Sequence, residues 1–339
     1  MSDPIDIRTK HIIPELRTSK FDKHLVLEGL EQNIVSHYDA WGGFQQHWIG
    51  KAYKAFKDID KYVVLMFLVR NYWQNLADKF VYLSMDKFYG LENIKIDKIN
   101  LISISSELNI PKETIRRKVN ELQGSGILSR EGKSIVLNKK IVNYEKHEET
   151  VEILSSFIQK HSHLLEGKEW FGEGLKKEEI QQFIKKYFTI TWLRFFKLQM
   201  PFLTRNRNVF RDLETWIVWG NIALSHQYDM SKALEKDLIR ENIESNNYYK
   251  SLMAFKKERG INASSIADIS SIPRATVIRK LKWLVKNDLI RRNRRLEYQM
   301  KSTGKLNKTI HQNTIINQGA IADFLTDIFD YMKNSNFKI

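Results

Sequence analysis

The chain has 339 residues, of which 42% are hydrophobic and 12% aromatic, so it is long enough and apolar enough for two or three domains with their own cores. It contains no cysteine, which excludes disulfides, thiolate metal sites and cysteine nucleophiles, and it has no apolar run of the roughly 18 residues that a transmembrane helix needs. Its 55 Lys and Arg residues outnumber 40 Asp and Glu, and the formal net charge of +15 favours a polyanionic partner such as nucleic acid.

The first residues, MSDPIDIRTKHIIPEL, are charged where a signal peptide would be apolar, so we expect a cytoplasmic protein. Residues 1–34 have no counterpart elsewhere in the chain and are predicted to form an N-terminal arm, helical in part. The stretch DKYVVLMFLVRNYW, residues 60–73, is apolar nearly all round, which indicates a buried helix. Because the chain holds only five prolines and fifteen glycines and most segments have helical periodicity, the predicted fold class is mainly α.

A first motif begins at residues 101–110, LISISSELNI, which predict a short helix followed by a turn, and Pro111 suits the first position of the next helix. That next helix has aliphatic residues at i, i+4 and i+7 spacing, which indicates a buried face made of Ile115, Val119 and Leu122. Two short β-runs follow around Glu131-Gly132, the dipeptide of a hairpin turn. Helix, turn, helix and hairpin predict a winged helix-turn-helix, whose second helix enters the DNA major groove while the hairpin meets phosphates.

The candidate DNA contacts of this first motif are the polar and basic residues away from the buried face, together with basic residues of the hairpin. They are Lys112, Glu113, Thr114, Arg116, Arg117, Asn120, Arg130 and Lys133. Each of these side chains could also belong to an ordinary solvated helix face, and the second motif helps to decide between the two interpretations.

The motif occurs twice, as IPKETIRRKVNEL from Ile110 and as IPRATVIRKLKWL from Ile272. Two further blocks repeat in the same order: FKDIDKYVV and FRDLETWIV upstream, and LNKKI and LNKTI downstream. Three matched blocks in one order predict a tandem duplication of a helical unit that contains the winged helix-turn-helix. The predicted organisation is an N-terminal arm at 1–34, a first repeat at 35–165, a linker at 166–186 and a second repeat at 187–339.

In the second motif the predicted buried face is Val277, Leu281 and Leu284, and a hairpin follows in LIRRNRRLEYQM. The candidate DNA contacts are Arg274, Thr276, Arg279, Lys282, Arg292, Arg294 and Arg295. From residue 274 to residue 305 there are eleven basic and two acidic residues, and from 112 to 140 there are eight and three. These local net charges of +9 and +5 account for nearly the whole excess of the chain, which places the positive charge on the two motifs.

The first copy, ISSELNIPKETIRRKVNELQGSGILSREGKSIVL, resembles the DNA-binding domain of the cyclic-AMP receptor type of bacterial regulator, and the second, SIADISSIPRATVIRKLKWLVKNDLI, is similar to the winged helices of the MarR and IclR groups. The first resemblance implies base-reading roles for Lys112, Glu113 and Arg117. In the second copy Ala275 stands at the position of Glu113, so the base-reading role that the resemblance implies for Glu113 does not apply there. Residues 1–100 do not resemble a cyclic-nucleotide domain, and nucleotide sensing is not implied.

A tryptophan in the second motif and two histidines outside the motifs are better explained by structural roles than by functional ones. Trp283 is expected to pack against the helical remainder or another chain, and His161 and His163 would bind a metal only with further ligands nearby. We recognise no phosphate-binding loop, catalytic triad or pair of catalytic carboxylates in the sequence. We therefore expect neither an enzyme nor a cofactor or metal.

The sequence thus predicts a transcription regulator that binds double-stranded DNA sequence-specifically, with both recognition helices in one chain. Self-association and a contact with RNA polymerase are compatible with such a protein, and a membrane is not an expected partner. Two alternatives stay open: a plasmid- or phage-type replication initiator with two winged-helix domains, and a scaffold whose winged helices bind other proteins.

Overall fold

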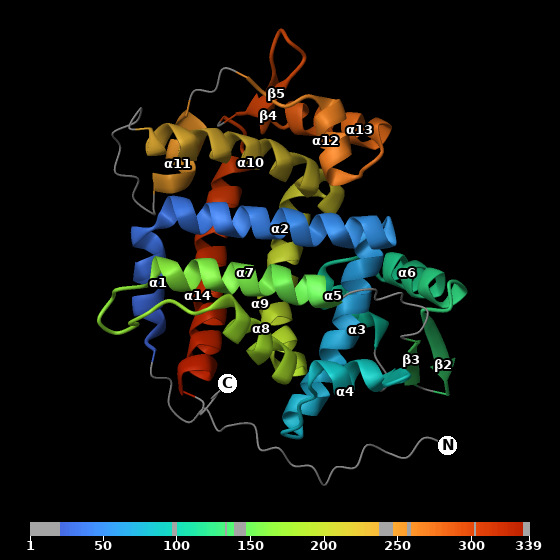
Figure 1. Cartoon of the computed structure of the whole chain (residues 1–339). Helices are drawn as coiled ribbons and strands as arrows, with labels where there is room; N and C mark the ends of the chain where they lie inside the picture. Colours follow the sequence, from blue (N-terminus) through green and yellow to red (C-terminus); the bar gives the residue numbers. More distant parts are fainter. Residues whose placement is uncertain are drawn as a thin grey trace.

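A computed structural model of the chain confirms the prediction of a mainly helical fold, with 73% helix in 14 helices and a small amount of antiparallel sheet within the residues described (Figure 1). In this part of the chain, no helix combines the length and apolar character needed to cross a membrane. The structure describes residues 21–96, 100–132, 134–138, 147–236, 247–255, 259–301 and 303–334.

The elements of the first half end with a helix that follows a three-stranded sheet. In chain order they are α1 (Lys23–Gln32), α2 (Ile34–Phe56), α3 (Ile59–Asp78), α4 (Met85–Gly90), β1 (Asn93–Ile96), α5 (Leu101–Leu108), α6 (Lys112–Gly124), β2 (Leu128–Glu131), β3 (Ser134–Asn138) and α7 (His147–Leu164).

The second half begins with α8 and ends with the longest helix described. Its elements are α8 (Lys177–Lys186), α9 (Phe188–Phe210), α10 (Leu213–Glu235), α11 (Tyr248–Ala254), α12 (Ala263–Ser270), α13 (Arg274–Lys286), β4 (Ile290–Arg292), β5 (Tyr298–Met300) and α14 (Asn307–Asn334).

The two FKD and FRD blocks mark helix starts, because each places an aspartate at an N-cap. Asp58 accepts hydrogen bonds from the backbone N–H groups of Asp60 and Lys61 at the start of α3. Asp212 accepts one from the N–H of Thr215 at the start of α10. Side-chain oxygens at this position satisfy N–H groups that have no partner within the helix.

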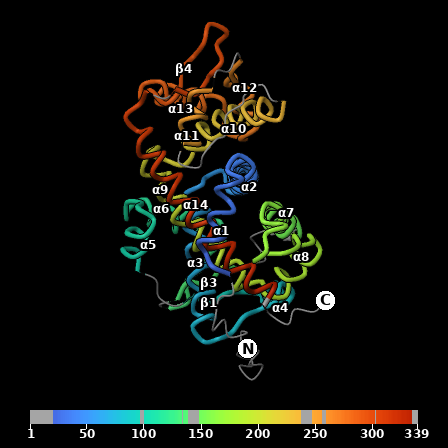
Figure 2. Tube along the Cα trace, turned by 90° about the vertical axis from the view of Figure 1, so that its left-hand side faces the viewer, coloured from blue at the N-terminus to red at the C-terminus, as the bar shows by residue number. Residues whose placement is uncertain are grey.

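The helices enclose one continuous hydrophobic core that is rich in aromatic rings. Helix α2 packs against α7 and α10, α3 packs against α9, and α14 runs beside α9 and α1 (Figure 2). Segments from the two predicted repeats therefore pack directly on each other. The segment 166–186, predicted as a linker, contains α8 and the buried side chains of Phe171 and Leu175.

Hydrogen bonds and aromatic contacts connect α2 and α9 across this core. The amides of Gln45 and Gln199 exchange two hydrogen bonds of 2.8 Å. On either side, the rings of Trp41 and Phe202 lie 5.1 Å apart, and those of Trp48 and Phe195 lie 4.9 Å apart, both edge to face. Buried aromatic pairs of this geometry add to the burial of apolar surface.

The sheets are small and antiparallel. β3 pairs with β2 on one side and with β1 on the other, and the register places Glu131 opposite Ser134. Strand β1 was not predicted from the sequence. β4 pairs with β5, and Ile261 forms an isolated bridge to Tyr298 of β5. Ile261 thus lies beside β5 in the second sheet, as β1 lies beside β3 in the first.

Candidate nucleic-acid interface

Helices α5 and α6 are joined by a tight turn in which Asn109 adopts a left-handed conformation at the end of α5. Pro111 is the residue before α6 begins, one position earlier than the sequence suggested. The predicted aliphatic stripe of α6 is buried, with exposed fractions of 0% for Ile115, 2% for Val119 and 1% for Leu122. This burial fixes which side of α6 faces outward.

The outward side of α6 carries most of the residues predicted from the first motif. Thr114 is half-buried, and the exposed side chains are Lys112, Glu113, Arg116, Arg117 and Asn120. Two ion pairs moderate the positive charge of this surface: Arg116 with Glu113 at 3.0 Å, and Arg117 Nε with Glu121 Oε1 at 3.8 Å.

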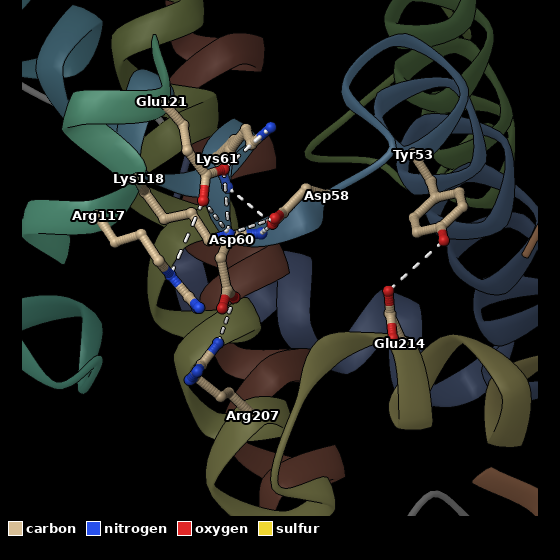
Figure 3. Close-up of polar contacts among 9 residues, drawn as sticks. All are labelled: Tyr53, Asp58, Asp60, Lys61, Arg117, Lys118, Glu121, Arg207 and Glu214. Atoms are coloured by element: carbon tan, nitrogen blue, oxygen red, sulfur yellow. Dashed lines mark hydrogen bonds and ion pairs between the residues drawn. The ribbon is translucent and has the colours of Figure 1, made fainter. Parts of the chain in front are cut away.

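Lys118, between these exposed residues in sequence, turns inward (Figure 3). Its Nζ lies 2.5 Å from Oδ2 of Asp58, the cap of α3, and 3.3 Å from Oε1 of Glu121, which also pairs with Lys61 at 3.0 Å. Burial alone would lower the pKa of Lys118, but hydrogen bonding and attraction to Asp58 and Glu121 raise it. Burial alone would raise the pKa of Glu121, but its hydrogen bonds with Lys61 and Lys118 lower it. Both groups are thus charged, and they hold α6 on α3.

Helices α12 and α13 repeat this arrangement. Ser271 has the left-handed conformation at the end of α12, and Val277, Leu281 and Leu284 of α13 are each 0% exposed. Arg274, Arg279 and Lys282 are exposed and Thr276 is half-buried. Within the described part of the chain, Arg279 and Lys282 make no ion pair, so the outer side of α13 is more positive than that of α6.

Lys280 anchors α13 as Lys118 anchors α6. Its Nζ lies 2.7 Å from Oδ2 of Asp212, the cap of α10, and 3.4 Å from Oε2 of Glu214. Burial would raise the pKa of Asp212, but the bonds from Lys280 and Thr215 lower it. Of the Arg-Lys dipeptide shared by the two motifs, the arginine therefore faces outward and the lysine serves as an anchor.

The two hairpins differ in charge. In the first, Arg130 is exposed, Lys133 lies outside the described residues, and Glu131 pairs with Lys95 at 3.3 Å. In the second, Arg292, Arg294 and Arg295 are all exposed.

The turn of the second hairpin is held by hydrogen bonds around Glu297. Its carboxylate accepts from the backbone N–H of Gly260 at 3.0 Å and from Asn293 Nδ2 at 2.9 Å. The bond from Gly260, and then that from Asn293, lowers the pKa of this carboxyl group. The backbone N–H of Arg295 donates to Asn293 Oδ1 at 2.9 Å, so the arginine-rich tip has a defined backbone.

Trp283 is half-buried and packs against the hydrophobic core. The two histidines considered as metal ligands have separate partners, since His161 lies 3.0 Å from His37 and His163 lies 3.0 Å from Glu166. In the described ranges, no three His, Asp or Glu side chains are grouped as a metal site requires.

The two motifs occupy different parts of the molecule, with α6 and β2–β3 at the right and α13 and β4–β5 at the top of Figure 1. Comparisons of the chain with protein-family models, with curated proteins and with solved structures gave no match.

Proposed function

We propose that this protein binds double-stranded DNA sequence-specifically and regulates transcription, with α6 and α13 as two recognition helices in one chain. The observation that carries the proposal is the shared pattern of these helices: each buries an aliphatic stripe, anchors a lysine on an aspartate cap, and exposes an arginine, Arg117 or Arg279, beside a hairpin. A helix with one face fixed on its own domain and a basic polar face outward suits the major groove.

We further infer a tandem duplication whose halves pack as a pseudo-dimer. Gln45 and Gln199, which bond to each other, are 154 positions apart, and Phe56 and Phe210 of the repeated blocks have the same separation. The same offset exchanges the pair Trp41–Phe202 with the pair Phe195–Trp48. Contacts that exchange in this way are expected where two equivalent units meet about a twofold axis.

Two polar contacts at the edge of this interface are also exchanged by the offset of 154 positions (Figure 3). Tyr53 Oη donates to Glu214 Oε1 at 3.5 Å, and Arg207 pairs with Asp60. Tyr53 corresponds to Arg207 and Asp60 to Glu214 under the same offset. The exchange of contacts supports an origin in which a dimer interface became internal to one chain.

The proposal assigns the hairpins β2–β3 and β4–β5 as wings that contact phosphates, with Arg130 on the first and Arg292, Arg294 and Arg295 on the second. Phosphate contacts position a protein on the duplex, whereas base contacts specify the sequence. The protein would act in the cytoplasm, without catalysis and without a cofactor.

The two recognition helices should read different half-sites. Glu113 aligns with Ala275, Arg116 with Ile278, and Asn120 with Lys282, so the outward faces differ although the anchors match. Dimeric helix-turn-helix proteins present their recognition helices one helical turn apart, about 34–36 Å along the duplex. We therefore expect an asymmetric site with two unlike halves on one face of the DNA.

Selection of bound sequences from random duplex DNA tests this proposal. The wild-type protein should enrich two unlike half-sites, Arg117→Ala should relax the preference in one half, and Arg279→Ala in the other. Lys87→Ala, an exposed lysine of α4, serves as the matched control and should select the wild-type site. Selection of a perfect inverted repeat that both helices contact equally would contradict the prediction of two unlike half-sites. Absence of any enriched sequence would favour the scaffold.

A further inference from the structure

Leu296 is an exposed apolar residue at the tip of the second hairpin. Its exposed fraction is 58%, whereas Leu289 and Ile290, where the hairpin begins, are 0% and 1% exposed. The loop that joins β4 and β5 extends beyond the helices at the top of Figure 1. Leu296 therefore gains only part of the stabilisation that burial gives an apolar side chain.

The tip is a three-residue loop between Asn293 and Glu297. The N–H of Leu296 donates to the carbonyl of Asn293 at 3.1 Å, and the N–H of Asn293 donates to the carbonyl of Glu297 at 2.9 Å. Hairpin loops of this length usually end with a residue in the left-handed conformation, which is most often glycine. Leu296 holds that position here, with a φ of 62°.

The left-handed conformation is unfavourable for leucine, because its Cβ lies too close to the following carbonyl oxygen, whereas glycine has no such clash. The turn of the first hairpin has the expected residue, since Gly132 has a φ of 59°. The second hairpin instead places a leucine in the strained position and leaves it largely exposed. Backbone strain of this kind concentrates at functional sites. The side chain of Leu296 is thus a candidate for contact with a partner.

The surroundings of Leu296 are basic, and its loop is held in place. Arg294 and Arg295 precede it and are both exposed. Glu297, which follows it, accepts a hydrogen bond from the N–H of Gly260 at 3.0 Å, and this bond ties the loop to the segment before α12. A fixed loop with an apolar side chain beside two cationic ones suits a partner that places apolar surface next to phosphates. Double-stranded DNA has this property where stacked bases lie between its two backbones.

We propose that Leu296 is a wedge that enters the minor groove beside the half-site of α13, packs between two adjacent base pairs and bends the duplex. The wedge rests on the proposed DNA-binding function, and Arg294 and Arg295 would hold the phosphates on either side of it. Apolar side chains that enter the minor groove in this way, leucine among them, unstack a base step and bend DNA by about 20–90°.

The wedge adds two properties to the expected DNA site. The step opened by Leu296 should be pyrimidine–purine, TA or CA/TG, because these steps unstack most readily. The first hairpin has Gly132 in its turn and therefore no side chain at this position to insert. The bend should accordingly lie in the half-site of α13 alone.

Fluorescence energy transfer between dyes at the two ends of a duplex measures the bend. The duplex carries the site selected by the full-length protein and has about 40 base pairs, far below the persistence length of about 150, so it is nearly straight when free. Saturation with wild-type protein should raise the transfer, and Leu296→Ala should lose at least about half of this change. Leu296→Met keeps a long apolar side chain and should bend DNA as the wild type does.

Phe80→Ala is the matched control. Phe80 lies just after α3, outside both hairpins, and like Leu296 it is an exposed apolar residue in the left-handed conformation, with an exposed fraction of 73% and a φ of 56°. Its replacement should leave the bend unchanged. Leu296→Gly tests whether the leucine serves the fold instead. Glycine relieves the left-handed strain, so this variant should melt close to the wild-type temperature and still fail to bend DNA. A large fall in its melting temperature would assign Leu296 to the stability of the hairpin and overturn the wedge.

The position of the wedge is measured with 2-aminopurine, placed in turn at each adenine of the selected site. Wild-type protein should raise the fluorescence of the base at one step in the half-site of α13, because an unstacked base is no longer quenched by its neighbours, and Leu296→Ala should not. The salt dependence of binding should be the same for Leu296→Ala and the wild type, since no phosphate contact is lost.

Failure of the wedge is distinguishable from failure of the proposed function. A wild-type protein that binds its selected duplex but leaves it straight, or an equal bend with Leu296→Ala, would overturn the wedge and leave DNA binding intact. A protein that binds no duplex would overturn both.

Discussion

Gln45 of α2 and Gln199 of α9 form a closed pair of side-chain amides, in which each Nε2 donates to the other Oε1 at 2.8 Å. Both residues are buried, with exposed fractions of 4% and 0%. The pair satisfies two amides at once and fixes how α2 and α9 align. Removal of one partner leaves the other without its reciprocal bonds in the core.

We expect the single variants Gln45→Leu and Gln199→Leu each to lower the free energy of unfolding by about 1–3 kcal/mol, the cost of an unsatisfied buried polar group. The double variant should recover most of this loss, because two leucines leave no amide unpaired. Denaturant unfolding of the four proteins gives the coupling energy. Gln312→Leu, an exposed position of α14, is the control and should change little. Additive losses in the double variant would show that the amides do not act as a pair.

The anchor between Lys118 and Asp58 gives a second prediction. Asp58→Asn keeps a residue that caps helices well but removes the charge that faces Lys118, whose side chain is only 8% exposed. We expect a loss of about 1–2 kcal/mol in unfolding free energy, since Glu121 still compensates part of the lysine charge. Asp22→Asn is a matched control, because Asp22 also caps a helix but forms no ion pair within the described residues.

The same variant tests the role of the anchor in positioning α6. If Lys118 holds α6 against α3, Asp58→Asn should weaken DNA binding more than Asp22→Asn does. A stability loss without any difference in DNA affinity would assign the anchor to folding alone.

Sequence patterns predicted the local parts of this molecule well. The aliphatic spacing of Ile115, Val119 and Leu122 identified the buried face of α6, because a helix places residues i, i+4 and i+7 on one side. The same spacing placed Arg117 on the outward side and left Lys118, three positions after Ile115, out of the predicted DNA contacts. It could not predict the partner of Lys118, because Asp58 lies 60 positions away in the chain.

Long-range partners explain the other differences. Strand β1 has only four residues, too few for a clear strand pattern in the sequence, and it forms because it pairs with β3. The predicted linker contains α8 because Ile180, Phe183 and Ile184 find a core to pack against.

Two buried histidines predict how stability depends on pH. His161 Nδ1 lies 2.8 Å from the Phe157 carbonyl and its Nε2 lies 3.0 Å from His37 Nδ1, which is consistent with two neutral rings in a chain of hydrogen bonds. Burial, and then the adjacent His161, lowers the pKa of His37. Burial lowers the pKa of His161 to about 4, although its bond to the Phe157 carbonyl acts in the opposite direction.

Because both pKa values are lower in the folded than in the unfolded protein, the unfolded chain binds more protons once the pH falls below about 6.5. The free energy of unfolding should therefore decrease between about pH 6.5 and pH 5, with a limiting slope of about 1.4 kcal/mol per pH unit for each histidine. His37→Asn, which keeps a donor toward His161, should have about half this slope. His24→Gln, at an exposed position of α1, should keep the wild-type slope. A pH-independent stability across this range would contradict the prediction.

The arginine-rich tip of the second hairpin gives the last prediction. Arg294 and Arg295 are exposed on a turn whose backbone is fixed by Asn293 and Glu297. If both side chains contact phosphates, their replacement by alanine should weaken binding to all DNA sequences alike. The slope of log affinity against log salt should become shallower by about 1 for each lost contact, because fewer counterions are released on binding.

Binding of the R294A/R295A double variant to a selected site and to an unrelated duplex, each over a range of salt concentrations, measures this effect. The control is Lys87→Ala, which removes an exposed lysine from α4 at the opposite end of the molecule from the hairpin (Figure 1). Its salt slope should equal that of the wild type, because removal of a lysine that is not assigned to a phosphate contact leaves the number of counterions released on binding unchanged. A double variant that loses affinity for the selected site alone, with an unchanged slope, would mean that the hairpin reads bases. An unchanged affinity for both duplexes would mean that the hairpin does not face the DNA.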